Sequence, residues 1–336
     1  MSTTITFGTG GDYDNLYLAW KHLVDITKNH IPEVSLTTDY ILQCVSDQSF
    51  TDWVAYPSDY VNGGGHTVTI QGLSDHGGDH SKTYYIDRPS SSTRFYFHLK
   101  NGVVLIKDLW FRRSFSPKVA TGPLFTMQSD DGNSFIVTDC FFSGVMPDDY
   151  DEKGAPLVDW GSSNLTTSLL KNCKFWRAGR GVITGDSGDS VCRIQNCDFY
   201  YCGTGIYVGA WSTTDNFKFV NVNISGCEKS FAKHNPSYYV SLSYCADDNN
   251  LLPAHTGKLV INPFSPEYLS VNPAVPESFL KPTATSQLWG SGTTSIHAQN
   301  IAGIEGNPRP NANGTVSRGA YEYLIVLWRQ KIMQFF

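Results

Sequence analysis

The sequence has little charge and no long apolar stretch. Charged residues make up 17 % of its 336 residues, and the net charge is −6. It lacks a cluster of Lys and Arg that would bind phosphates, which excludes a nucleic-acid partner. A helix that crosses a bilayer needs about 18 consecutive apolar residues, and no such run occurs. Residues 2–7 lack the basic start and apolar core of a secretory signal, so we expect synthesis in the cytoplasm and no membrane insertion.

Several catalytic motifs are also missing. Residues 8–11 are rich in glycine but lack the Gly-Lys-Ser/Thr of a phosphate-binding loop, and no dinucleotide fingerprint follows a strand. There is no Gly-x-Ser-x-Gly motif, and the eight cysteines show neither Cys-x-x-Cys spacing nor an obvious His partner. We therefore expect no bound cofactor.

What the sequence does contain is a short block that recurs along it. Each copy reads apolar, polar, Asn or Asp, Cys, any residue, Phe, and the copies occupy residues 137–142, 170–175 and 194–199. A degenerate copy at 219–224 lacks the Cys, and a further copy lies at 106–111. The Asn/Asp positions follow one another at steps of 31, 33, 24 and 25 residues. Recurrence on this scale predicts a solenoid, whose coils bury their apolar faces against their neighbours.

The block also predicts which side chains lie inside the coils. The repeated Cys and Phe positions form one inward stack: Cys140, Cys173, Cys197, Phe142, Phe175 and Phe199. The Asn/Asp position is expected to form a ladder of side-chain hydrogen bonds between coils. Coils about 4.8 Å apart would bring the thiols within reach of disulfide formation. We favour buried free thiols, because small apolar side chains explain these positions fully.

Four segments are predicted along the chain. Residues 1–39 contain a strand at 3–7 and a capping helix from about 14 to 29, with Leu16, Trp20, Leu23 and Ile26 on one face. Residues 40–246 form the parallel β-helix, beginning with β-rich runs at 40–45, 67–71, 83–86, 95–99 and 103–106. Residues 247–323 are rich in Pro and wrap the solenoid in extended form. Residues 324–336 are an apolar tail.

The apolar tail is predicted to dock, either on its own solenoid or on another chain, because a free terminus is rarely so apolar. Its apolar side chains are Leu324, Ile325, Leu327, Trp328, Ile332, Phe335 and Phe336.

Three features together resemble right-handed parallel β-helix proteins of the pectate-lyase-like superfold, including phage tailspikes. They are the repeated block, the opening at residues 8–16, and the ending formed by residues 306–310 and 319–323. The resemblance implies an all-β fold with structural roles for Gly319 and Tyr321, and it implies trimers as the common assembly. The tail after Tyr323 departs from it. The acidic and basic elements of polygalacturonase-like hydrolases are not found as a set.

Candidate catalytic and metal-binding residues are few. Asp186 and Asp189 would supply the two carboxylates that a glycosidase needs, although a turn between coils explains them better. His66, His76 and His80 form the richest histidine neighbourhood, but the glycine pair at 77–78 separates the last two from a shared helix face. We therefore expect neither a catalytic centre nor a metal site at these residues.

One set of outward-facing residues remains. If the repeated Phe points inward, the next residue points outward, which places Arg112, Trp176 and Tyr200 on one outer face. Flat aromatic rings along a groove suit sugar rings. Three interpretations stay open: a glycan-binding surface, an interface with another chain, or a surface covered by a loop of this chain, such as 146–156.

The function most in keeping with these features is a non-enzymatic component of a phage or other virus particle, such as a tail, spike, fibre or capsid-attached protein. Its partners would be other virion proteins, copies of itself and host-surface polysaccharide. One alternative is a glycan depolymerase, either a lyase or a hydrolase. Another is a carbohydrate-binding adhesin without turnover.

Overall fold

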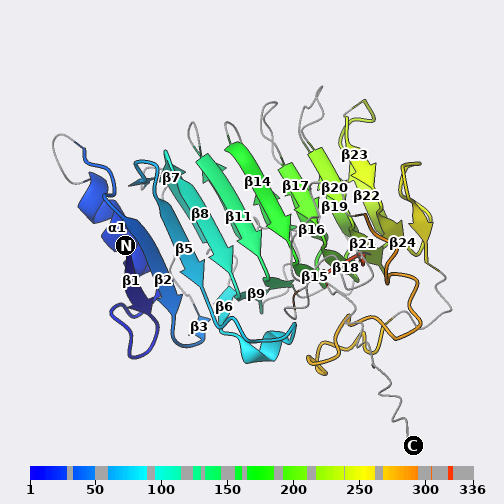
Figure 1. Cartoon of the computed structure of the whole chain (residues 1–336), viewed down its shortest axis with the longest axis horizontal. Helices are drawn as coiled ribbons and strands as arrows, with labels where there is room; N and C mark the ends of the chain where they lie inside the picture. The colour runs from blue at the N-terminus through cyan, green and yellow to red at the C-terminus, as the bar shows by residue number, and fades with distance from the viewer. Residues whose placement is uncertain are drawn as a thin grey trace, which may run out of the picture.

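The computed structural model describes residues 1–28, 33–49, 60–88, 95–114, 124–129, 133–144, 156–160, 165–184, 192–209, 217–237, 239–261, 268–293, 304 and 317–320. The chain folds as a parallel β-helix, so the predicted fold class is confirmed. In this part of the chain the strands form three parallel sheets of nine, nine and seven strands, which we name A, B and C. Figure 1 shows the coils advancing from the N-terminal helix toward β24. None of the described helices is long and apolar enough to cross a membrane.

Sheet A contains, in spatial order, β1 (Ser2–Phe7), β2 (Asp39–Cys44), β5 (Thr67–Gln71), β8 (Val103–Lys107), β11 (Asn133–Thr138), β14 (Leu165–Lys171), β17 (Cys192–Gln195), β20 (Phe217–Val220) and β23 (Ser241–Ser243). Sheet B contains β3 (Gln48–Ser49), β6 (Tyr85–Arg88), β9 (Trp110–Arg113), β12 (Phe141–Ser143), β15 (Lys174–Trp176), β18 (Asp198–Tyr200), β21 (Asn223–Ser225), β24 (Ala246–Asp247) and β25 (Leu259–Val260). Sheet C contains β4 (Val61–Asn62), β7 (Phe95–Lys100), β10 (Phe125–Ser129), β13 (Pro156–Trp160), β16 (Arg180–Thr184), β19 (Thr204–Val208) and β22 (Lys229–Lys233).

The repeated Phe side chains form the stack inside the coils. Phe111, Phe142, Phe175 and Phe199 are fully buried, and their rings are nearly parallel. The ring centroids of Phe142 and Phe175 lie 4.8 Å apart, and those of Phe175 and Phe199 lie 4.6 Å apart. These distances match the spacing of paired strands, so each ring packs on the ring of the next coil.

The cysteines lie in the same core. All eight are free and buried, and Cys140, Cys173 and Cys197 are 0 % exposed. Burial raises the pKa of the Cys140 and Cys197 thiols well above its ordinary value. These thiols therefore act as small apolar side chains.

The Asn/Asp position of the repeat turns the chain from sheet A into sheet B. Asp108, Asp139, Asn172, Asn196 and Asn221 all have φ between 51° and 58°, in the left-handed region that Asn and Asp tolerate best. The side-chain amide of Asn172 donates to Asp139 Oδ1 at 3.0 Å, and the side-chain amide of Asn221 donates to Asn196 Oδ1 at 3.1 Å. The expected ladder therefore forms at these two steps.

Helix α1 (Leu16–Lys28) packs on the first coils. Asn15 caps it through a 3.0 Å hydrogen bond from the Leu18 amide. Its apolar face belongs to the main core, and Trp20 meets Phe97 of β7 edge to face at 5.2 Å. Strand β1 pairs with β2 along its whole length, so the first residues already form part of sheet A.

Candidate functional site

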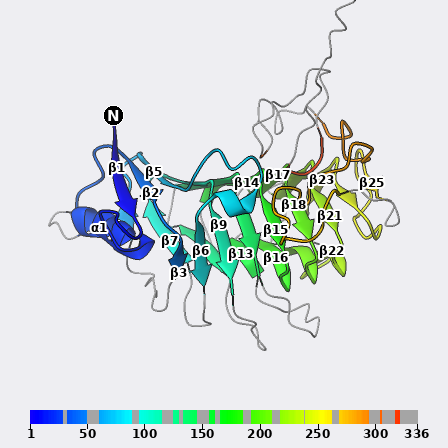
Figure 2. The ribbon, with the colours of Figure 1, turned by 90° about the horizontal axis from the view of Figure 1, so that it is seen from below.

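The sequence-predicted surface residues lie on the outer face of sheet B. Two columns of side chains point outward there, and successive members lie in register on paired strands. One column is Trp110, Phe141, Lys174, Asp198 and Asn223, and the other is Arg112, Ser143, Trp176, Tyr200 and Ser225. Figure 2 shows the loop after β5 (cyan) and a C-terminal segment (orange) on the side of sheet B.

Trp176 is covered by these two segments. It is 2 % exposed, and its ring lies 5.0 Å from the ring of His80 and 5.0 Å from that of Phe279. His80 begins the 3-10 helix η1 (His80–Lys82), in the loop 72–84 that joins β5 to β6. Of the three interpretations of this face, the described residues show cover by the chain itself at Trp176. The segments that provide it are 72–84 and 268–293; residues 145–155 lie outside the described part.

Lys174 fastens both covering segments to the wall. Its side chain is 0 % exposed, and Nζ donates to the carbonyl of Gly78 at 2.8 Å and to that of Phe279 at 2.9 Å. The ammonium also lies over the rings of Phe141 and Phe279. Burial, and after it the charge of Lys174, lowers the pKa of His80 to about 4. His80 is therefore a neutral ring in an aromatic cluster.

Arg112 and Tyr200 occupy different surroundings. The Arg112 guanidinium lies 3.6 Å from the centre of the Tyr85 ring, and its Nε lies 3.3 Å from Asp87 Oδ1. Tyr200 is half-buried and packs edge to face on Tyr268 and Phe279. Arg112, Trp176 and Tyr200 thus share one face of the β-helix but do not form one open groove.

The segment 317–320 is seated at the far end of the same wall. The Ala320 amide donates to Asp198 Oδ2 at 2.8 Å, and the Gly319 amide donates to the Asn221 carbonyl at 2.8 Å. Arg318 donates to the carbonyls of Cys245 and Ser291. Gly319 has φ +81°, and a Cβ there would lie 2.2 Å from Asp198 Oδ1. These contacts support the structural role that the resemblance implies for Gly319.

The three candidate histidines lie in three different settings. His66 Nδ1 contacts Asp39 Oδ1 at 3.2 Å, and His76 Nε2 contacts Asp108 Oδ1 at 3.3 Å. His80 is enclosed by aromatic rings. Within the described residues, no three His, Cys, Asp or Glu side chains converge as metal ligands. The other candidates, Asp186, Asp189, Tyr321 and the tail 324–336, lie outside the described part.

A cleft that sequence reasoning missed lies at the base of the 72–84 loop. It consists of two cavities of about 620 Å³ and about 360 Å³, which have Leu73 and Tyr84 as common walls. Asp75 and Asp108 line the larger cavity, and Trp110 lines the smaller one. We call the two cavities together the loop cleft. Its sequence signal is the polar residue at the end of a sheet A strand, as in Gln71 of β5 and Lys107 of β8.

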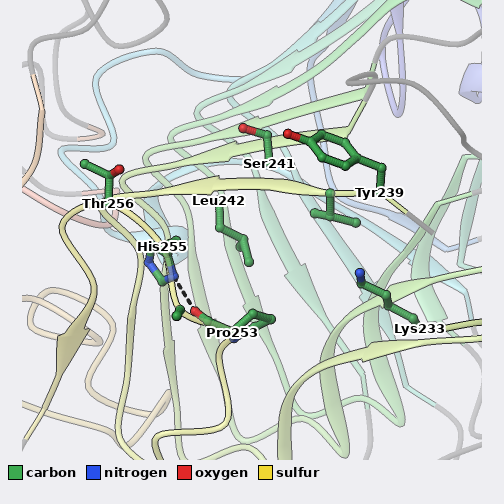
Figure 3. Close-up of a pocket in the computed structure, with 9 residues that line it drawn as sticks. Lys233, Tyr239, Ser241, Leu242, Pro253, His255 and Thr256 are labelled. Carbon is green, nitrogen blue, oxygen red and sulfur yellow. Dashed lines mark hydrogen bonds between the residues drawn. The ribbon is translucent and has the colours of Figure 1, made fainter. Parts of the chain in front are cut away.

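A smaller pocket of about 270 Å³ lies at the last coil, between β22, β23 and residues 253–256 (Figure 3). His255 Nδ1 lies 2.7 Å from the Pro253 carbonyl oxygen, drawn as a dashed line, and Nε2 accepts from the Cys245 amide at 3.2 Å. Nδ1 therefore fixes the ring within residues 253–256, and Nε2 holds this segment against Cys245 of the preceding coil. This arrangement closes the end of the coil and leaves neither nitrogen for chemistry.

Comparisons with protein-family models, curated proteins and solved structures found no match for this chain.

Proposed function

We propose that this protein is a non-enzymatic structural component of a virus particle, such as a tail, spike, fibre or capsid-attached protein. The observation that carries the proposal is the wall of sheet B, fastened under the chain's own segments through Lys174, Asp198 and Arg318. A continuous core of stacked coils with such a largely covered wall suits a stiff structural part. The apolar sequence at 324–336 supports attachment to other proteins.

The carboxylates with raised pKa values support a role without turnover. Burial raises the pKa of Asp139, which is bonded to Thr138 and Asn172 in the ladder. Burial likewise raises the pKa of Asp248, which accepts the Gly226 amide in a turn. Both groups hold backbone or ladder geometry, whereas a catalytic acid would be expected to face an open groove.

The test is to look for the protein in assembled particles. Gradient-purified particles from the source of this sequence should contain it in a fixed ratio to the major coat protein, measured by quantitative mass spectrometry. A variant that lacks residues 324–336 should keep the circular dichroism of the full chain and lose incorporation. Finding the full-length protein only outside particles would contradict the proposal.

A glycan depolymerase is the second candidate, because Asp75 and Asp108 line one cavity. Asp108 is 7 % exposed and contacts His76, which assigns it a supporting role in the fold. Incubation with a panel of bacterial polysaccharides would decide the matter. A depolymerase should release oligosaccharide products, and Asp75→Asn should abolish this release. Our proposal of a structural role expects no product release from any polysaccharide.

A further inference from the structure

We infer that the loop cleft binds a neutral oligosaccharide. Each of its two cavities lies within the size range of about 300 to 1,000 Å³ that is typical of small-molecule sites. Because they have Leu73 and Tyr84 in common, the cleft extends from the turn between sheets A and B to Trp110. A ligand made of successive units fits this elongated shape better than a single compact molecule.

Partly exposed aromatic rings line the cleft. Tyr84, Tyr85 and Trp110 are each intermediate in exposure, and the rings of Tyr85 and Trp110 lie 5.9 Å apart. Trp110 Nε1 donates to Ser143 Oγ at 2.8 Å, which fixes the orientation of the indole. Fixed aromatic rings with one wet side pack well on the C–H faces of sugars.

Polar groups line the larger cavity, where Tyr84 is the aromatic wall, and they stand on a rigid support. Gln43, Gln71 and Lys107 occupy the same position on the paired strands β2, β5 and β8. Gln71 Nε2 donates to Gln43 Oε1 at 2.6 Å, so the two amides are held before any ligand arrives. Groups that are already ordered lose little entropy on binding. With exposed Asp75 and with Lys107, they offer both donors and acceptors to hydroxyl groups.

The charges of the cleft select the ligand class. The residues that line the cleft include three carboxylates, Asp47, Asp75 and Asp108, and two lysines. These are Lys107 and Lys82, and Lys82 already pairs with Asp79. This small acidic excess disfavours phosphates, nucleic acids and uronic acids. Aromatic rings combined with balanced hydrogen-bonding groups favour a neutral sugar.

This inference goes beyond the structural role proposed above, since it concerns binding by the isolated protein. The experiment presents labelled full-length protein to an array of neutral di- to tetrasaccharides built from hexose, deoxyhexose and N-acetylhexosamine units. Uronic-acid oligosaccharides are printed beside them. The strongest binder is then titrated by calorimetry against the wild type and the variants.

Lys107→Ala and Asp75→Ala should each lower the affinity about tenfold, because each removes hydrogen bonds to a charged group. Lys171→Ala is the matched control: Lys171 holds the same column position two coils further on, on β14, and lies outside the cleft. It should bind as the wild type does. The inference is overturned if no neutral glycan binds, if acidic glycans bind better, or if both cleft variants keep wild-type affinity. Particle incorporation, measured separately, tests the structural role.

Discussion

Substituting Gly319 by Ala tests how the C-terminal segment is seated. An Ala at φ +81° takes on the cost of the left-handed region, about 1–2 kcal/mol. Its Cβ would also meet Asp198 Oδ1 at 2.2 Å, so the carboxylate must move away from the Ala320 amide that it binds at 2.8 Å. Loss of a hydrogen bond to a charged group adds about 1.5–3 kcal/mol. We expect Gly319→Ala to reduce the free energy of opening of residues 317–320 by about 2.5–5 kcal/mol.

Gly10→Ala supplies the matched control. Gly10 has φ +83°, but nothing lies within 4 Å of its Cβ position, so this variant carries the backbone cost alone. Hydrogen exchange followed by mass spectrometry measures local opening at each site, and urea unfolding measures the rest of the coil. Gly319→Ala should exceed Gly10→Ala by about 2 kcal/mol. Equal costs at the two sites would refute the argument that Asp198 seats this segment.

Three further results are expected. Lys174→Met should remove the hydrogen bonds from the ammonium to the carbonyls of Gly78 and Phe279 and cost about 2–4 kcal/mol in urea unfolding, and no change would refute the fastening role. Since the pKa of His80 falls from 6.5 unfolded to about 4 folded, its stabilising contribution is full above pH 6.5. As the pH falls toward 4 this contribution is lost, which lowers the free energy of unfolding by about 3 kcal/mol. His80→Phe should show no such loss when its unfolding is measured at pH 6.5 and at pH 4. Finally, burial raises the pKa of the Cys44 thiol to about 12, and all eight thiols are buried. Ellman's reagent should therefore label no thiol in the native protein and eight in guanidinium. Labelling of the core thiols in the native protein would contradict this burial.

The coil itself was open to prediction because its rules are local. A left-handed turn favours Asn or Asp. The first and third residues after the turn point into the core, and the second and fourth point outward, so a short block predicts the core stack. One copy escaped because its side chains differ: Tyr244 takes the turn position with φ 52°, and the buried Cys245 follows it. Strand β1 pairs with β2 over six residues, and β25 pairs with β24 over two, so sheets A and B also include strands outside residues 40–246.

The covering segments were beyond prediction for a physical reason. Besides aromatic packing, the wall holds them through their backbone: Lys174 binds carbonyls 96 and 105 residues away, and the side-chain amide of Asn221 pairs with both the N–H and the carbonyl of Thr293. Backbone groups are the same in every residue, so the sequence of the covering segments gives little indication of the wall residues that they contact. The sequence signal lies instead in the wall, as an outward-facing polar residue next to aromatic side chains. Lys174, which pairs with Phe141 on the neighbouring strand and precedes Trp176 by two residues on its own strand, is such a residue. An outward Lys, Asp or Asn in a β-helix wall should therefore be tested first as an anchor for the chain's own cover, and only then as a ligand-binding group.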